Sequence, residues 1–321
     1  MKLSPLPLLL LLAVAGQDAF AEGRSAGAAA LIIGKLPVGT RAIALSGAYT
    51  ALADDASAVW WNPACLARVN KPGMGLIHVE EGQDVRMEGV LFALPVIAGG
   101  TAAAGAGYLG MPPIVETMET PQGFYKGEGK TFDAWEFKGA LGYGQYLNRW
   151  GQLPLLDPLW ERGAVGVNVA VLGERVGGES YYSVSTDAGY LYDDPANGRR
   201  LGLVLRSLGM PADGAPLPVT GQAGVAQEWG AWNITGDILT ATDDSYRVRG
   251  GLECNYDAGD SQVILRGGAQ HSFSTHLNAW WSLGLGYRFK LPGEFEFSVD
   301  YAFVPVAMFN ALNAVSVEVL F

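Results

Sequence analysis

From about residue 70 onward, the chain repeats runs of about ten residues in which bulky apolar side chains alternate with polar or small ones. Successive side chains of a β-strand point to opposite faces, so each run predicts a strand with one bulky apolar face and one polar or small face. This pattern is typical of a membrane-spanning barrel, in which one face meets lipid and the other lines the lumen. The clearest apolar faces are Tyr246, Val248, Leu252 and Tyr256; Trp281, Leu283, Leu285, Tyr287 and Phe289; and Phe295, Phe297, Val299, Tyr301 and Phe303.

The runs and the turn residues between them predict about fourteen antiparallel strands. An even count places the first and last strand ends of the chain on the periplasmic side, with the connections 110–131, 209–217 and 304–311 outside the cell. The pattern does not explain the long periplasmic connection 148–160. The predicted strands lie near 73–80, 87–95, 100–109, 132–146, 163–173, 182–192, 199–208, 218–228, 231–240, 245–256, 261–270, 277–289, 294–303 and 312–321.

The best candidate for a membrane-spanning helix is the apolar stretch 89–110, which contains Pro95 and six glycines. In a soluble helix each Gly costs about 1 kcal/mol and each Pro about 3 kcal/mol, although transmembrane helices tolerate both better. Two strands that turn at Gly99 and Gly100 account for the same residues more simply.

The first 21 residues have the layout of a secretory signal peptide. Lys2 gives a positive start, an apolar run follows from Leu6 to Gly16, and Ala19-Phe20-Ala21 forms a cleavage site. The apolar run is short for a membrane span, and the alternative is a buried N-terminal helix. We therefore predict a signal peptide at 1–21 and export to the outer membrane of a Gram-negative bacterium.

Residues 22–70 are rich in Gly and Ala and do not alternate as strands do. Irregular backbone at membrane depth has to be buried in protein, so this segment is expected to plug the lumen as a hatch, and residues 71–321 to form the barrel. Within it, Asp55 is expected to cap a short helix that runs to about Trp60. Pro63 disfavours helix at Asn62 and is expected to end it there.

Composition supports a chain with hidden apolar surface. Charged residues make up 17% and hydrophobic residues 49%, whereas soluble domains carry about 25% charge. The formal net charge of −11 argues against a nucleic-acid partner, because little is left to neutralise phosphates. Cys65 and Cys254 are expected to be unpaired small apolar residues, with a disulfide between them as the alternative.

The chain shows no set of residues that would support an enzyme. Adjacent Asp54 and Asp55 point apart at a helix start, which favours hydrogen bonding within the hatch over paired acid–base chemistry. His78, His271 and His276 lack ligand spacing with cysteines or carboxylates. We therefore predict no catalytic residue, no cofactor and no metal site.

Charged residues on the small faces of the late strands are expected to line the lumen. They form either a structural network that joins wall and hatch or part of a substrate path, and the mixed signs favour the network. Arg41 in the hatch is expected to pair with one of the acids. The lumen candidates are Arg247, Arg249, Glu253, Arg266, Arg288, Glu296 and Asp300.

The last strand carries a further signal. Val315, Val317, Val319 and Phe321 alternate outward, and an aromatic residue ends the strand. A terminal aromatic of this kind resembles the signal read by the outer-membrane assembly machinery. That machinery and outer-membrane lipid are the expected partners of any such barrel.

Most of the mature chain, and most specifically the stretch 39–64, resembles the PorV/PorQ-like proteins, which are related to the FadL long-chain fatty-acid transporters. Shared features are Gly-x-Arg-Ala, Gly-Ala-Tyr, Ala-Asp-Asp-Ala and Trp-Asn-Pro-Ala, and Cys65 and Ser207 depart from the usual Gly and Asn. The matching hatch residues are Arg41, Tyr49, Asp54, Asp55, Trp61, Asn62 and Pro63.

The resemblance implies an all-β, fourteen-stranded transmembrane barrel with an N-terminal hatch inside the lumen. It leaves three functions open, since a fold does not fix a function. The first is passage of hydrophobic small molecules across the outer membrane. The second is a type IX secretion-type partner that binds secreted protein cargo through extracellular loops such as 110–131. The third is a structural barrel without a ligand.

Overall fold

The structure is a computed structural model that describes residues 29–82, 84–96, 99–151, 157–242, 244–273, 281–291, 295–306 and 310–321. The predicted signal peptide at 1–21 lies outside the described residues, as do the first seven residues of the predicted hatch. No helix in the described ranges is long and apolar enough to cross a membrane.

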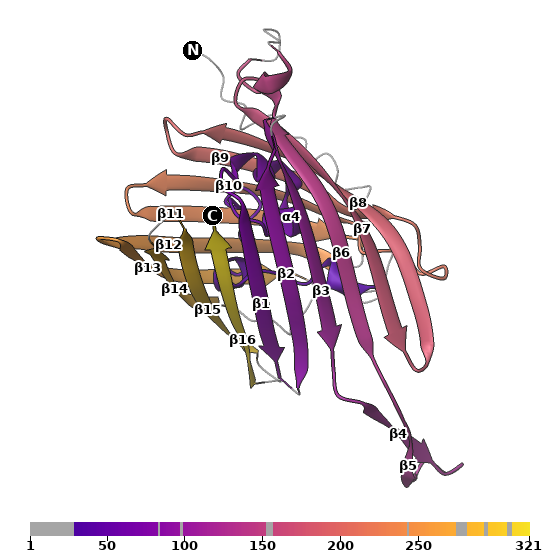
Figure 1. The fold of residues 1–321 in the computed structure, drawn as a ribbon. Coiled ribbons are helices and arrows are strands. Elements are labelled where there is room, and N and C mark those ends of the chain that lie inside the picture. The colour runs from indigo at the N-terminus through magenta and orange to yellow at the C-terminus, as the bar shows by residue number, and fades with distance from the viewer. Residues whose placement is uncertain are drawn as a thin grey trace.

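Fourteen strands close into one antiparallel barrel (Figure 1), which confirms the predicted fold class and strand number. Each strand pairs with its neighbours in the chain, except that β3 pairs with β6, and β1 pairs with β16 to close the wall. The wall strands are β1 Gly73–Glu81, β2 Val85–Pro95, β3 Gly100–Gly110, β6 Trp135–Tyr146, β7 Gly163–Val176, β8 Glu179–Asp194, β9 Arg199–Gly209, β10 Thr220–Trp229, β11 Trp232–Ala241, β12 Asp244–Ala258, β13 Ser261–Ser272, β14 Trp281–Lys290, β15 Glu296–Val306 and β16 Asn310–Leu320.

The sequence pattern did not predict the hairpin between β3 and β6. Its strands, β4 Ile114–Glu119 and β5 Tyr125–Phe132, pair only with each other and project from one end of the barrel (Figure 1). Every side chain of β4 is exposed, so no buried face imposes an alternation on its sequence. We call this end the hairpin mouth and the opposite end, where β1 begins and β16 ends, the terminal mouth.

The outer surface carries an apolar band between two groups of aromatic side chains. Toward the hairpin mouth, Trp135 lies 6.3 Å from Tyr108 and 6.1 Å from Phe137, measured between ring centroids. Toward the terminal mouth, Phe289 lies 5.7 Å from Tyr287 and 5.4 Å from Phe297. Leucine, isoleucine and valine are exposed between the groups, which is the arrangement of a barrel embedded in lipid with an aromatic girdle at each interface.

The segment before β1 runs through the lumen from one mouth to the other. Near the hairpin mouth its backbone N–H groups donate to the wall, from Leu31 to Glu174 at 3.0 Å and from Ile33 to Glu136 at 2.7 Å. It ends at the terminal mouth, where β1 begins with Gly73. Its short helices are η1 Ile32–Gly34, α3 Thr40–Ala44, α4 Ala58–Trp61 and η2 Pro63–Arg68.

Inward-facing glycines let this segment pack directly on the wall. A Cβ added to Gly166 of β7 would lie 2.2 Å from the carbonyl carbon of Pro63, and one added to Gly268 of β13 would lie 2.4 Å from that of Leu45. Gly105 of β3 faces the indole of Trp60 in the same way. Since real Cβ contacts are never this short, glycine is required where hatch and wall meet.

Candidate functional site

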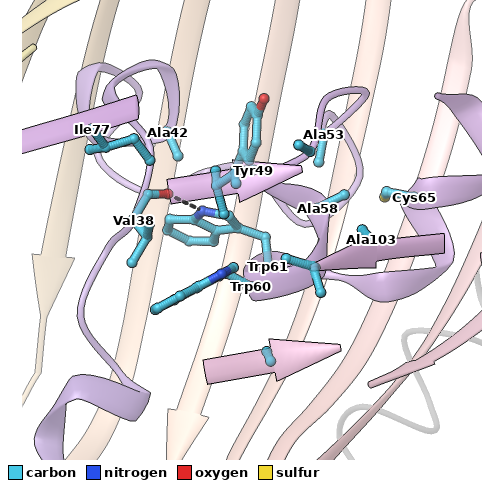
Figure 2. Close-up of a cluster of buried hydrophobic side chains, with 14 of the residues drawn as sticks. Val38, Ala42, Tyr49, Ala53, Ala58, Trp60, Trp61, Cys65, Ile77 and Ala103 are labelled. Atoms are coloured by element: carbon cyan, nitrogen blue, oxygen red, sulfur yellow. Dashed lines mark hydrogen bonds between the residues drawn. The ribbon is translucent and has the colours of Figure 1, made fainter. Parts of the chain in front are cut away.

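The hatch motif folds around Tyr49 and Trp61, which meet edge to face with 5.8 Å between ring centroids. The indole N–H of Trp61 donates to the carbonyl of Val38 at 2.6 Å (Figure 2). Both aromatic side chains are buried among the small side chains of the hatch and the inner wall. The motif therefore forms the apolar centre of the plug.

Asn62 and Pro63 join α4 to η2. The Asn62 backbone is extended, so α4 ends at Trp61, as the proline predicted. The Asn62 side chain accepts from the Ala64 N–H at 3.1 Å and donates to the Thr50 carbonyl at 2.9 Å. Asn62 thus caps η2 and ties it to the rest of the hatch.

The expectation that Asp55 caps α4 is wrong. The helix begins at Ala58, and Ser57 is the residue that precedes it. The carboxylate of Asp55 instead accepts the Ser57 N–H at 2.8 Å and the Tyr49 hydroxyl at 2.7 Å. The Asp55 carboxylate is therefore held within the turn at 55–57, and the helix starts after that turn.

Arg41 joins hatch and wall. Its Nη1 lies 2.5 Å from Asp54 in the hatch, and its Nε and Nη2 donate to the two carboxylate oxygens of Glu253 on β12 at 2.8 and 2.9 Å. This is the two-bond geometry that makes arginine–carboxylate pairs strong. Arg266 on β13 also donates to Glu253, at 2.7 Å, and to Asp300 on β15.

The charges around Asp54 keep it ionised. Burial alone would raise the pKa of its carboxyl, but the charges of Arg41 and Arg68 lower it by more, and the net effect is a pKa below the ordinary value. Arg68 also donates to the Leu52 carbonyl at 2.8 Å. An ionised Asp54 between two guanidinium groups fixes the turn of the hatch that faces the terminal mouth.

The other predicted lumen residues are spread over the inner wall. Arg249 donates to the hatch carbonyl of Gly47 at 3.3 Å, and Glu296 lies 2.8 Å from Lys71 just before β1. Arg288 faces the cavity described next, and Arg247 lies on the inward side of β12. Glu253, Arg266 and Asp300 are thus brought together around Arg41, whereas Glu296 belongs to a separate contact.

A cavity of about 700 Å³ opens at the terminal mouth. Its walls are mostly polar, with charges of both signs from the hatch and from the strand ends. Such a vestibule is suited to water and ions, and it gives an apolar molecule little favourable contact. Six of the lining residues are Arg41, Asp54, Arg68, Arg288, Glu296 and Glu318.

Sequence analysis missed two buried carboxylates of the inner wall, of which Asp237 holds the hatch and Asp187 joins neighbouring wall strands. Asp237 on β11 accepts the backbone N–H groups of Tyr49 and Thr50 at 2.9 and 3.0 Å. Asp187 on β8 accepts the Ser207 N–H at 2.7 Å and lies 3.8 Å from Lys138. Both occupy lumen-facing positions of predicted strands, and that parity was the available signal.

The regular wall is interrupted on the hairpin-mouth side of β9. Arg206 and Ser207 together face the single residue Asp187, which is a β-bulge, and Ser207 takes a left-handed φ of 59°. Beyond Gly209, residues 210–219 fill the space between β8 and β10. We call residues 205–219 the seam; its contacts include Met210 N–H to the Val184 carbonyl at 3.3 Å and Ala30 N–H to the Pro216 carbonyl at 3.2 Å.

The last strand lies in the wall as β16. Val315 and the terminal Phe321 are exposed on the outer surface, and the Phe321 N–H donates to the Pro72 carbonyl at 3.0 Å. Its recognition by the assembly machinery stays a prediction.

The two cysteines are both free. Cys65 is buried within η2, and burial raises the pKa of its thiol to about 12. Among the described residues, no group of three or more His, Cys, Asp or Glu side chains gathers as metal ligands would.

Comparisons with known proteins agree with this geometry at the level of the fold. Residues 12–120 match the model of an uncharacterised protein family, UPF0164. No curated protein matches the chain.

Solved structures with the same fold include two toluene transporters. TodX of Pseudomonas putida has a TM-score of 0.58 at 10% identity, and TbuX of Ralstonia pickettii has a TM-score of 0.58 at 11% identity. Each alignment covers 88% of this chain and 97% of the other. A FadL homologue of Pseudomonas aeruginosa has a TM-score of 0.56 at 10% identity, covering 89% of this chain and 98% of the other.

These likenesses show that the chain has the β-barrel fold of FadL-type proteins. At such low identity they show the fold alone. The resemblance to PorV/PorQ-like proteins in particular stays a prediction.

Proposed function

We propose that this protein is an outer-membrane barrel that passes hydrophobic small molecules, and that they cross the wall at the seam. The apolar outer band between two aromatic girdles supports a place in a membrane. The fold shared with proteins described as toluene transporters and monoaromatic hydrocarbon channels supports apolar cargo.

The observation that carries the proposal is that the strand ladder gives way at the seam, where apolar side chains lie on both the inner and the outer side of the wall. Leu217 is 3% exposed and packs in the core with Leu31 and Leu172, whereas Met210 and Leu208, on the same segment, are 65% and 41% exposed. A continuous strand would separate such inner and outer side chains by a hydrogen-bonded ladder. Here the ladder between β8 and β9 ends at Ser185 and Gly209.

The composition of the seam suits a segment that moves beside lipid. Unpaired backbone N–H groups are costly in hydrocarbon, and Pro211, Pro216 and Pro218 carry none. Displacing this segment therefore exposes fewer unpaired donors than displacing a strand would. In this proposal an apolar molecule leaves the lumen beside Leu217 and avoids the charged vestibule at the terminal mouth.

The test is uptake in a Gram-negative host that lacks its own transporter. Outer-membrane location and heat-modifiable migration are checked first. Cells that make the protein should then accumulate a fluorescent long-chain fatty acid faster than cells with an empty vector. Leu217→Gln should reduce the gain, and Leu265→Gln, on the outer face of β13, should not. No gain over the empty vector, with the barrel in place, would contradict the proposal.

One observation favours a second candidate, a partner that binds secreted protein cargo. The β4–β5 hairpin projects from the hairpin mouth and exposes Ile114, Met118, Phe124 and Tyr125, and an exposed apolar group of this kind marks a contact surface. Deleting 112–131 should abolish cargo binding while leaving fatty-acid uptake unchanged. The reverse result would favour transport through the hairpin mouth itself.

A further inference from the structure

An apolar groove of about 800 Å³ lies on the outer surface across β16, β1, β2, β3 and β6. The register places Leu76, Val90, Ala106 and Gly139 in one outward row, so the side chains shrink from leucine to glycine along it. A Cβ added to Gly139 would have nothing within 4 Å. Five strands at about 4.8 Å spacing make the groove roughly 19 Å long.

The neighbouring outward row forms one side of the groove. It is aromatic on β3 and β6 and polar on β1 and β2. Tyr108 and Phe137 lie beside Ala106 and Gly139, the small residues of the groove floor. Next to them, at the same level, His78 Nδ1 lies 2.7 Å from Glu88 Oε1. One row nearer the hairpin mouth, Arg86 lies 3.8 Å from Glu80.

We propose that this groove binds one zwitterionic phospholipid. Its acyl chain lies over Ala106 and Gly139 against the rings of Tyr108 and Phe137. Its ammonium group meets Glu88, and its phosphate meets Arg86. The inference rests on the proposed membrane location, but not on transport.

Three features support a lipid as the occupant. The groove faces outward in the apolar band, where acyl chains are the surrounding solvent. The exposed ion pairs lie only on the hairpin-mouth side of the floor row, level with the aromatic girdle, as a head group above an acyl chain requires. The two ion pairs offer both a carboxylate and a guanidinium, which complements a head group that carries both signs.

The test is native mass spectrometry of the full barrel, folded and heat-modifiable in detergent, with phosphatidylethanolamine or phosphatidylglycerol added. The wild-type barrel should retain one phosphatidylethanolamine. Gly139→Leu fills the floor and should reduce that retention about tenfold or more. Gly250→Leu is the matched control, because Gly250 of β12 also faces outward with nothing within 4 Å of an added Cβ. Ala106→Leu serves as a second variant if Gly139→Leu does not fold.

Glu88→Gln should weaken retention of phosphatidylethanolamine and leave phosphatidylglycerol unchanged. Equal retention in Gly139→Leu and Gly250→Leu would overturn the site, and preferential retention of phosphatidylglycerol by the wild type would overturn the head-group assignment. Because no uptake is measured, these failures are distinct from a failure of the transport proposal.

Discussion

Gly166→Ala should unseat the hatch, because the added Cβ would lie 2.2 Å from the Pro63 carbonyl carbon, 2.3 Å from its oxygen and 2.4 Å from the Ala64 nitrogen. All three are backbone atoms, so no side-chain rotation relieves the clash. Overpacking of this kind costs about 1–3 kcal/mol. If the clash destabilises only the state in which the hatch packs on the wall, the population of the detached state rises roughly 5- to 150-fold.

The assay uses Cys65, which lies in η2 two residues after Pro63. Its buried thiol, with a pKa raised to about 12 by burial, should react with maleimide only when η2 leaves the wall. In a Cys254→Ser background, Gly166→Ala should speed labelling by the same roughly 5- to 150-fold, provided that reclosing is faster than the reaction.

Gly139→Ala is the control, since its Cβ would enter open space on the outer face of the adjacent strand. A folded, heat-modifiable Gly166→Ala barrel that labels at the wild-type rate would refute the idea that glycines seat the hatch. If Gly166→Ala does not fold, Gly144→Ala, whose Cβ would lie 2.3 Å from the Pro63 carbonyl oxygen, provides the second variant.

Three further predictions concern the polar contacts and the bulge. Arg41→Ala leaves buried Glu253 with one fewer partner, so it should speed Cys65 labelling and lower heat stability by up to about 3–5 kcal/mol; unchanged labelling would count against the Arg41 link. The lowered pKa of Asp54 means that its stabilisation is complete above about pH 4 and is lost as the pH falls further, so the difference in melting temperature between wild type and Asp54→Asn should be constant from pH 7 to 5 and shrink below pH 4. Ser207 has a left-handed φ of 59°, which costs an L-residue about 1–2 kcal/mol and glycine little, so Ser207→Gly should be at least as stable as wild type in urea unfolding, and a clear loss of stability would contradict the backbone argument.

The strands were predictable because lipid outside and a packed lumen inside impose an alternation that any single strand displays. Strand Trp232–Ala241 is an example, and its prediction at 231–240 missed each end by one residue. The hairpin at 114–132 was not predicted, because neither of its faces is buried in a core. The turn at Gly99 was also predictable, since its φ of 87° favours glycine.

The contacts between hatch and wall were less predictable, because they depend on which residues meet across the lumen. Arg41 could be singled out as a basic residue in a segment rich in small residues, and the structure places it on Glu253. The inward glycines gave no such signal. In the sequence, Gly105 and Gly166 look like residues that only weaken strands, and their role emerges when Trp60 and Pro63 are found against them.

The central claim, passage of apolar molecules through the seam, is tested most directly by an engineered disulfide that can be reduced. Cysteines at Val184 and Met210, whose backbones share a hydrogen bond, would tie the seam to β8 in a Cys254→Ser barrel. We predict that oxidation stops fatty-acid uptake and that reduction restores it, with the barrel heat-modifiable throughout. Uptake that is unaffected by an intact disulfide would contradict the account.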